Sequence, residues 1–139
     1  MIQCVKIEQT LSHIVEKVIH FMNVLIIDDN RDITDLLSKF LKSKGIENKV
    51  ANDPFVGLDL IKNEKYDVIL LDMSMPEFSG IDIIDTLDRE KILQDQKIII
   101  FSAISLTSSQ VMGLLKRNGV HDCLKKPLQL DKLLTAITC

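Results

Sequence analysis

Short apolar runs alternate with segments of helical periodicity from residue 24 to the end of the chain, and this alternation constrains the fold more than any other feature. Four strong runs lie at 24–27, 66–71, 97–101 and 120–124, and a weaker one at 46–51. Strands that are apolar on consecutive residues are typical of parallel sheets, because helices cover both faces of such a sheet. Five strand-helix repeats therefore predict an α/β domain with a doubly wound parallel sheet.

The segments between these runs carry helix start and stop signals. Asn30 is a suitable N-cap for the first helix and Gly45 a stop, while Asp53-Pro54 places an N-cap before a proline at the first helical position. Helices are predicted at about 31–44, 54–63, 81–87, 107–117 and 130–137. Residues 7–19 also show helical spacing and precede the first strand, which predicts an appendage helix in 1–21 before a single domain at 22–139.

The composition excludes several classes of protein. The 139 residues are 46% hydrophobic, and the net charge is −3 with charges of both signs interspersed, which argues against direct binding to nucleic acid. Charged residues interrupt the first 21 positions, so neither a signal peptide nor a membrane insertion is predicted there. Cys4, Cys123 and Cys139 show no paired spacing and are expected to be free thiols in a cytoplasmic protein.

Polar side chains follow four of the predicted strands. Asp28 and Asp29 follow the first, Asp72 the third, Ser102 the fourth and Lys126 the fifth. The carboxyl ends of parallel strands share one edge of the sheet, so these groups are expected to converge although they are far apart in sequence. Taken alone, Asp28-Asp29 could be an ordinary helix cap, and Ser102 could simply end its strand. The placement of all five polar residues directly after predicted strands favours a functional site.

Three clustered carboxylates need a compensating cation. Two charges roughly 5 Å apart cost about 3 kcal/mol at an effective dielectric near 20. A shallow site of carboxylates, one carbonyl and waters suits Mg²⁺ better than Ca²⁺. A cation, a lysine and a hydroxyl around one carboxylate suit phosphoryl transfer, with Asp72 as the nucleophile that becomes an aspartyl-phosphate.

From about Met22 to Ile137 the chain resembles a response-regulator receiver domain, of the kind found alone in chemotaxis proteins. The resemblance rests on four motifs in order: the acidic pair in Val-Leu-Ile-Ile-Asp28-Asp29, Asp72-Met-Ser-Met-Pro76 with Gly80 behind it, Ser102-Ala103, and Lys126-Pro127. It implies a flavodoxin-like (βα)5 doubly wound sheet with strand order 2-1-3-4-5.

The resemblance also implies a role for each site residue. Asp29, Asp72 and the backbone carbonyl of Ser74 would bind Mg²⁺ directly, and Asp28 would act largely through water. Ser102 would be the switch hydroxyl and Lys126 the lysine that contacts the phosphoryl group, with a cis peptide bond before Pro127. The adjacent Lys125 is interpreted as a surface residue.

Two positions depart from the family pattern. Cys123 occupies the place, three residues before the lysine, where the family often has a switch Tyr or Phe, so no aromatic ring can report phosphorylation. Ile104, two residues after the switch hydroxyl, belongs with Ser74 to the positions that tune hydrolysis of the phosphate in the family. A bulky apolar side chain there is expected to slow self-dephosphorylation.

The function implied is that of a single-domain response regulator of a two-component phosphorelay. It would accept a phosphoryl group from a sensor histidine kinase or phosphotransfer protein on Asp72, with self-catalysed transfer and autodephosphorylation but no independent metabolic activity. Residues 1–21 and the two after Ile137 are too short for an output module. The output is therefore expected to pass to a downstream protein through the face formed by 107–117, 120–124 and the last helix.

Three alternatives remain. A receiver-like scaffold that is never phosphorylated is the main competitor, and the intact acidic pair, acceptor and lysine argue against it. An aspartate-nucleophile phosphatase needs a second acid two residues after the first, where this chain has Ser74. A nucleotide or flavin binder would need a glycine-rich or Ser/Thr-rich phosphate loop after the first strand, which is missing.

Overall fold

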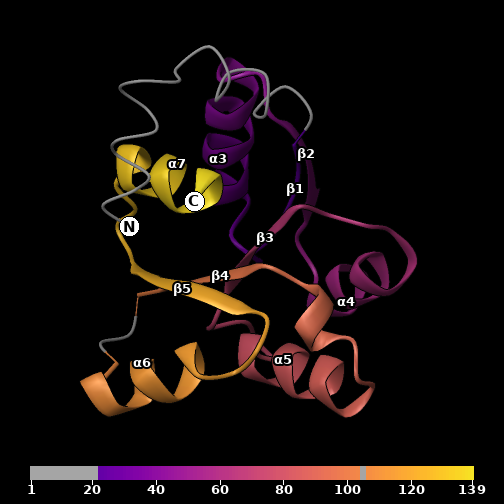
Figure 1. Cartoon of the computed structure of the whole chain (residues 1–139). Helices are drawn as coiled ribbons and strands as arrows, with labels where there is room; N and C mark the ends of the chain where they lie inside the picture. The colour runs from indigo at the N-terminus through magenta and orange to yellow at the C-terminus, as the bar shows by residue number, and fades with distance from the viewer. Residues whose placement is uncertain (1–21, 104–105) are drawn as a thin grey trace.

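A computed structural model of the chain describes residues 22–103 and 106–139. The helix predicted at 7–19 and the side chain of Ile104 lie outside the described residues. Across the described part, the strand-helix alternation is observed as predicted (Figure 1).

Five strands and five α-helices alternate along the described chain. The strands are β1 (Asn23–Ile27), β2 (Glu47–Ala51), β3 (Val68–Asp72), β4 (Ile98–Ser102) and β5 (Val120–Lys125). The helices are α3 (Arg31–Ser43), α4 (Pro54–Asn63), α5 (Gly80–Arg89), α6 (Ser108–Leu115) and α7 (Leu130–Thr138). A short 3₁₀ turn, η1 (Leu93–Asp95), follows α5 and was not predicted from the sequence.

The predicted helix caps are present. The Asn30 side chain accepts hydrogen bonds from two backbone N–H groups at the start of α3, and Asp53 does the same for α4, where Pro54 is the first helical residue. Such caps satisfy backbone donors that have no partner inside the helix. They also fix the residue at which each connection from the sheet edge becomes helical.

The sheet is parallel throughout, with strand order β2-β1-β3-β4-β5. This confirms the predicted flavodoxin-like topology. The register pairs Ile27 with Leu71 and Asp72 with Phe101, so the strands end at nearly the same level. Asp72 and Ser102 are the last residues of their strands rather than the first residues after them, a small correction to the predicted bounds.

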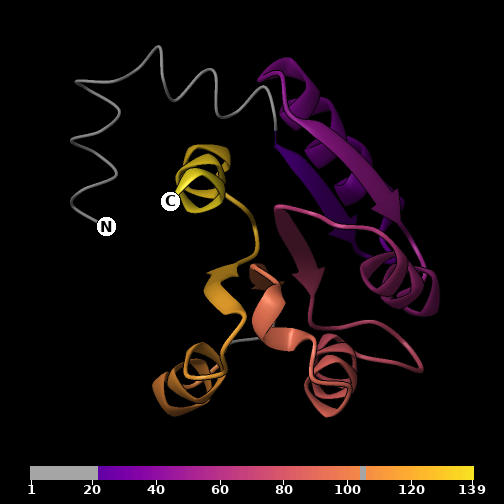
Figure 2. The ribbon, with the colours of Figure 1, turned by 45° about the vertical axis from the view of Figure 1, so that its right-hand side comes forward.

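Helices cover both faces of the sheet (Figure 2). Side chains of α4, α5 and α6 pack on one face against Leu25, Ile69 and Ile98. Side chains of α3 and α7 pack on the other face against Ile26, Leu70 and Ile99. Alternate residues of each central strand therefore enter different cores, which explains why these strands are apolar on consecutive residues.

Gly119 and Gly113 form a matched pair for testing backbone constraints. Gly119 begins the return to the sheet with a φ of 115°, and a Cβ there would lie 2.0 Å from the Leu93 carbonyl oxygen, whereas a Cβ on Gly113 in α6 would meet nothing within 4 Å. Gly119→Ala is expected to lower the free energy of unfolding by roughly 2–4 kcal/mol. Gly113→Ala is expected to raise it by roughly 0.5–1 kcal/mol. Urea unfolding measures the stability of both variants, and equal changes in stability would contradict the view that only Gly119 is restricted by its backbone conformation and by the Leu93 carbonyl.

Two further expectations concern cysteines and membranes. Cys123 is a free thiol, as expected, but Cys139 is disulfide-bonded, so the expectation of free thiols is wrong for Cys139. Spacing along the chain could not reveal this, because disulfides form between residues that the fold brings together. Within residues 22–103 and 106–139, no helix combines the length and apolar character needed to span a bilayer.

Candidate functional site

The predicted residues meet at the carboxyl edge of the sheet. Asp28 follows β1, Asp72 ends β3, Ser102 ends β4 and Lys126 follows β5. Asp28, Asp72 and Ser102 are buried, whereas Asp29 is exposed. Because β1, β3, β4 and β5 are neighbours in one parallel sheet, the fold alone brings these side chains to one place.

Lys126 bridges the two buried carboxylates. Its Nζ lies 3.1 Å from Asp28 Oδ2 and 3.3 Å from Asp72 Oδ1. Asp28 is fully buried and Asp72 is 2% exposed. Removing two carboxylates from water is costly unless they are paired, so the ammonium stabilises an arrangement that would otherwise repel itself.

The position of Lys126 is fixed by strand β4. Its backbone N–H donates to the Ser102 carbonyl at 2.9 Å, and its Nζ lies 5.0 Å from the centroid of the buried Phe101 ring. A cation over an aromatic face is attracted by the ring quadrupole. The Lys126-Pro127 peptide bond is cis, as the family resemblance implies. Phe101 was not singled out from the sequence, where it is one apolar residue in a buried strand.

The three carboxylates form a potential cation site. Among the described residues, Asp28, Asp29 and Asp72 each offer one oxygen, and these oxygens lie within 4.8 Å of one another. Asp72 Oδ1 also accepts a hydrogen bond from the Ser74 backbone N–H at 3.3 Å. A compact set of hard oxygen donors, two of them buried, fits a divalent cation of the Mg²⁺ type.

The electrostatics of the acidic pair agree with this interpretation. Burial raises the pKa of the Asp28 carboxyl, and the charge of Asp72 raises it further, while the Asn30 N–H and Lys126 oppose the rise. Loss of hydration and the Asp28 carboxyl raise the pKa of Asp29. Both carboxyl groups therefore lose their protons less readily than ordinary aspartates, and a bound cation would favour their charged forms.

Ser102 and Cys123 occupy the expected positions in the sheet. Ser102 follows Phe101, the register partner of Asp72, and is 3% exposed. Cys123 is a partly buried residue of β5, paired with Ile100 in β4. Burial raises the pKa of its thiol. The roles proposed for Ser102 and for the Ser74 carbonyl remain predictions.

A comparison with protein-family models matches residues 24–138 to the response regulator receiver domain. Among curated proteins, the response regulator MprA of Mycobacterium sp. (strain KMS) is 32% identical over 81% of this chain and 47% of its own length. The CpxR homolog of Haemophilus influenzae is 32% identical over 82% of this chain and 48% of its own length. The chain thus spans about half the length of these relatives.

Solved structures show the same likeness. The receiver domain of Francisella response regulator 1452 is 33% identical, with a TM-score of 0.74 over 84% of this chain and 93% of that one. A Burkholderia pseudomallei response regulator, described with a phosphorylated aspartic acid, calcium ion and citrate, is 25% identical, with a TM-score of 0.72 over 84% of this chain and 66% of that one. With the family match and the acidic site, these findings show that the chain belongs to the response regulator receiver domain family.

Proposed function

We propose that this protein accepts a phosphoryl group on Asp72 and signals through a phosphorylation-dependent change in protein binding. The observation that carries the proposal is the placement of Lys126 Nζ between the buried carboxylates of Asp28 and Asp72, with Asp29 beside them. The Burkholderia pseudomallei response regulator, whose structure contains a phosphorylated aspartic acid, supports the proposal. The proposal concerns the receiver domain, which is the part shared with the longer relatives.

The transfer step uses Asp72 as the nucleophile. Asp72 Oδ1 accepts hydrogen bonds from Ser74 N–H and Lys126 Nζ, so we assign the attack to Oδ2. An oxygen-phosphorus bond forms as the bond from phosphorus to the donor imidazole nitrogen breaks, and that nitrogen keeps the electron pair and takes a proton. Mg²⁺, when held by Asp29, Asp72 and the Ser74 carbonyl, with Asp28 acting largely through water, would neutralise charge on the phosphoryl oxygens.

Lys126 and Ser102 would act on the phosphorylated state. Phosphorylation replaces one carboxylate charge by a larger anion, so Lys126 would move its pairing from Asp72 Oδ1 to a phosphoryl oxygen. Ser102 ends the strand next to Asp72, where its hydroxyl could donate to the same group. Both shifts would pull on β4 and β5, the strands that lead to the signalling face.

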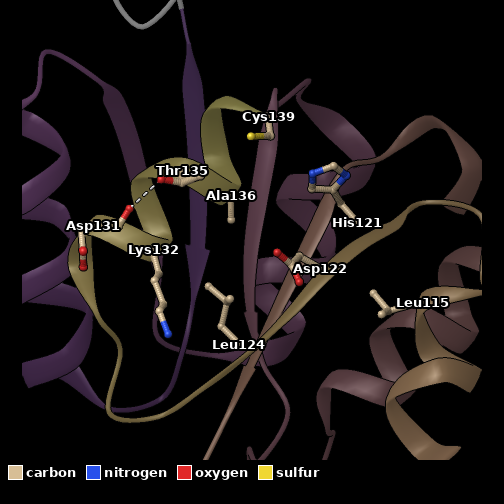
Figure 3. A pocket seen from close by; sticks show the side chains of 9 residues that line it. All are labelled: Leu115, His121, Asp122, Leu124, Asp131, Lys132, Thr135, Ala136 and Cys139. Atoms are coloured by element: carbon tan, nitrogen blue, oxygen red, sulfur yellow. Dashed lines mark hydrogen bonds between the residues drawn. The ribbon is translucent and has the colours of Figure 1, made fainter. Parts of the chain in front are cut away.

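The partners proposed are a histidine kinase or phosphotransfer protein upstream and a protein target downstream. Receiver domains pair with histidine kinases, which supports the first. For the second, the face of α6, β5 and α7 contains a cavity of about 440 Å³ lined by Leu115, Leu124, Ala136 and six other residues (Figure 3). We place the signalling in the cytoplasm, where response regulators typically work.

A scaffold that is never phosphorylated is the second candidate. It would need neither an acidic pair nor a lysine held between buried carboxylates, yet both occur together here. Buried charges are costly to maintain, so a purely structural role offers no reason for two buried carboxylates at one sheet edge. The phosphoacceptor therefore remains the better proposal.

Metal removal tests the proposed function. Incubation with acetyl phosphate and Mg²⁺ is expected to add one phosphoryl group, seen by intact-mass spectrometry, and EDTA is expected to abolish the adduct. The reason is that three clustered carboxylates repel an incoming phosphoryl group unless a cation is bound. Equal labelling with and without EDTA would contradict the proposal.

Slow self-dephosphorylation is a separate prediction. Ile104 is apolar where a polar side chain could position water, so the aspartyl-phosphate is expected to outlast seconds after removal of the donor. A phosphate-release assay on the wild type and on Ile104→Asn measures the lifetime. Loss within seconds in the wild type, or no acceleration in the variant, would contradict the prediction.

A further inference from the structure

Asn52 contacts the loop that carries the acidic pair, although it belongs to a different strand-helix unit. It directly follows β2, and its side-chain amide Nδ2 donates to the Asp28 carbonyl oxygen and to Thr34 Oγ1, both at 2.9 Å. The Asp28 backbone N–H in turn donates to the Ala51 carbonyl at 3.2 Å. The end of β2 therefore holds Asp28 through both its N–H and its C=O.

This pairing fixes the peptide plane between Asp28 and Asp29. A trans peptide is planar, so a hydrogen bond to its carbonyl sets the orientation of both flanking Cα atoms. Those two Cα atoms carry the carboxylates of the acidic pair. Asp28 also has its side chain held by the Asn30 N–H at 2.9 Å and by Lys126, whereas Asp29 is exposed and depends more on the backbone for its direction.

Thr34 completes the connection. It is 1% exposed, and its Oγ1 donates to the Arg31 carbonyl at 3.1 Å while accepting from Asn52. One hydroxyl thus links the Asn52 amide to the first turn of α3. The end of β2, the loop after β1 and the start of α3 are joined by side chains that contact no predicted metal-binding atom.

We propose that Asn52 is a positioning residue for the metal site, acting through the Asp28-Asp29 peptide with Thr34 as its support. The inference rests on the proposed function, because it assigns a role toward the cation expected there. Without the amide, the Asp28 carbonyl loses its side-chain donor and the peptide can rotate. Groups that orient metal ligands from outside typically change affinity by about 10–100-fold when replaced.

Asn48 provides a matched control. It lies within β2, four residues before Asn52, and is also partly buried. It too bridges to α3: its Nδ2 donates to the Ser38 and Ile46 carbonyls at 3.3 Å, and Ser38 Oγ donates to its Oδ1 at 2.7 Å. This bridge lies at the level of Val24, far along β1 from Asp28. If the bridges from β2 to α3 were purely structural, replacing either asparagine would change the Mg²⁺ affinity by the same factor.

The test is a titration of the full chain with Mg²⁺, monitored through the NMR shifts of the backbone amides around Asp28 and Asp29. It is carried out on the wild type, Asn52→Ala and Asn48→Ala. We expect Asn52→Ala to bind Mg²⁺ about tenfold more weakly and Asn48→Ala to match the wild type. Equal affinity in Asn52→Ala and the wild type, or equal weakening in both variants, would overturn the inference.

Two additions keep the outcomes separate. Thr34→Val removes the supporting hydroxyl with little change of shape, and it is expected to weaken Mg²⁺ binding by a smaller factor than Asn52→Ala does. This variant replaces Asn52→Ala in the test if Asn52→Ala does not fold. In that case, a Thr34→Val protein with the Mg²⁺ affinity of the wild type would overturn the inference. A wild type that shows no Mg²⁺ response would overturn the proposed metal site itself. A responding wild type with an unaffected Asn52→Ala would overturn only the positioning role.

Discussion

Asp72→Asn is expected to abolish the phosphoryl adduct formed from acetyl phosphate and Mg²⁺. The asparagine keeps the size of the side chain and can still accept from the Ser74 N–H, but it lacks the anionic oxygen that attacks phosphorus. Intact-mass spectrometry after the same incubation as the wild type measures the loss. An adduct of wild-type intensity would mean that another residue is the acceptor.

The same variant controls for folding. Asp28 and Asp72 are buried carboxylates that share Lys126, so Asp72→Asn removes both the repulsion between them and the cost of burying one charge, and these two gains offset the lost attraction to Lys126. Asp72→Asn is therefore expected to unfold at or above the wild-type urea midpoint. Marked destabilisation would make the missing adduct a consequence of unfolding instead.

Lys126→Met is expected to destabilise the metal-free protein by roughly 3 kcal/mol, because it leaves two buried carboxylates without their ammonium. Mg²⁺ is then expected to restore more stability in the variant than it adds to the wild type, since the cation replaces the missing charge. Urea unfolding with EDTA and with Mg²⁺ measures both effects. A saturating ligand at about 100 times its Kd adds about 2.7 kcal/mol, which is readily detected.

Lys125→Met is the matched control for that prediction. Lys125 is the exposed last residue of β5 and directly precedes Lys126. Its removal is expected to change stability by less than about 0.5 kcal/mol and to leave the Mg²⁺ effect as in the wild type. Equal losses at both lysines would contradict the assignment of Lys126 to the site.

The fold was predictable because its signals are local. The buried strands are apolar on consecutive residues, and caps such as Asn30 and Asp53 mark where helices start. The 3₁₀ turn at Leu93–Asp95 was missed, because it is three residues long and carries no periodicity. It matters nonetheless, since the Leu93 carbonyl is what restricts Gly119.

The site was predictable to the level of its charged residues, and less so beyond them. A parallel sheet brings strand ends together, so Asp28, Asp72 and Lys126 could be grouped from their positions after strands. The Asn52 amide, the Thr34 hydroxyl and the Phe101 ring could not be identified, because their roles depend on which side chains meet across different strand-helix units. The bond at Cys139 was missed for the same reason.

The most direct test of the central claim is to locate the phosphoryl group. The wild type would be incubated with acetyl phosphate and Mg²⁺, reduced with borohydride, which converts an aspartyl-phosphate to homoserine, and sequenced by peptide mass spectrometry. Homoserine at position 72, present with Mg²⁺ and missing with EDTA, is the predicted result. Homoserine at another aspartate, or a phosphoryl group that survives borohydride on a different side chain, would contradict the claim that Asp72 is the phosphoacceptor.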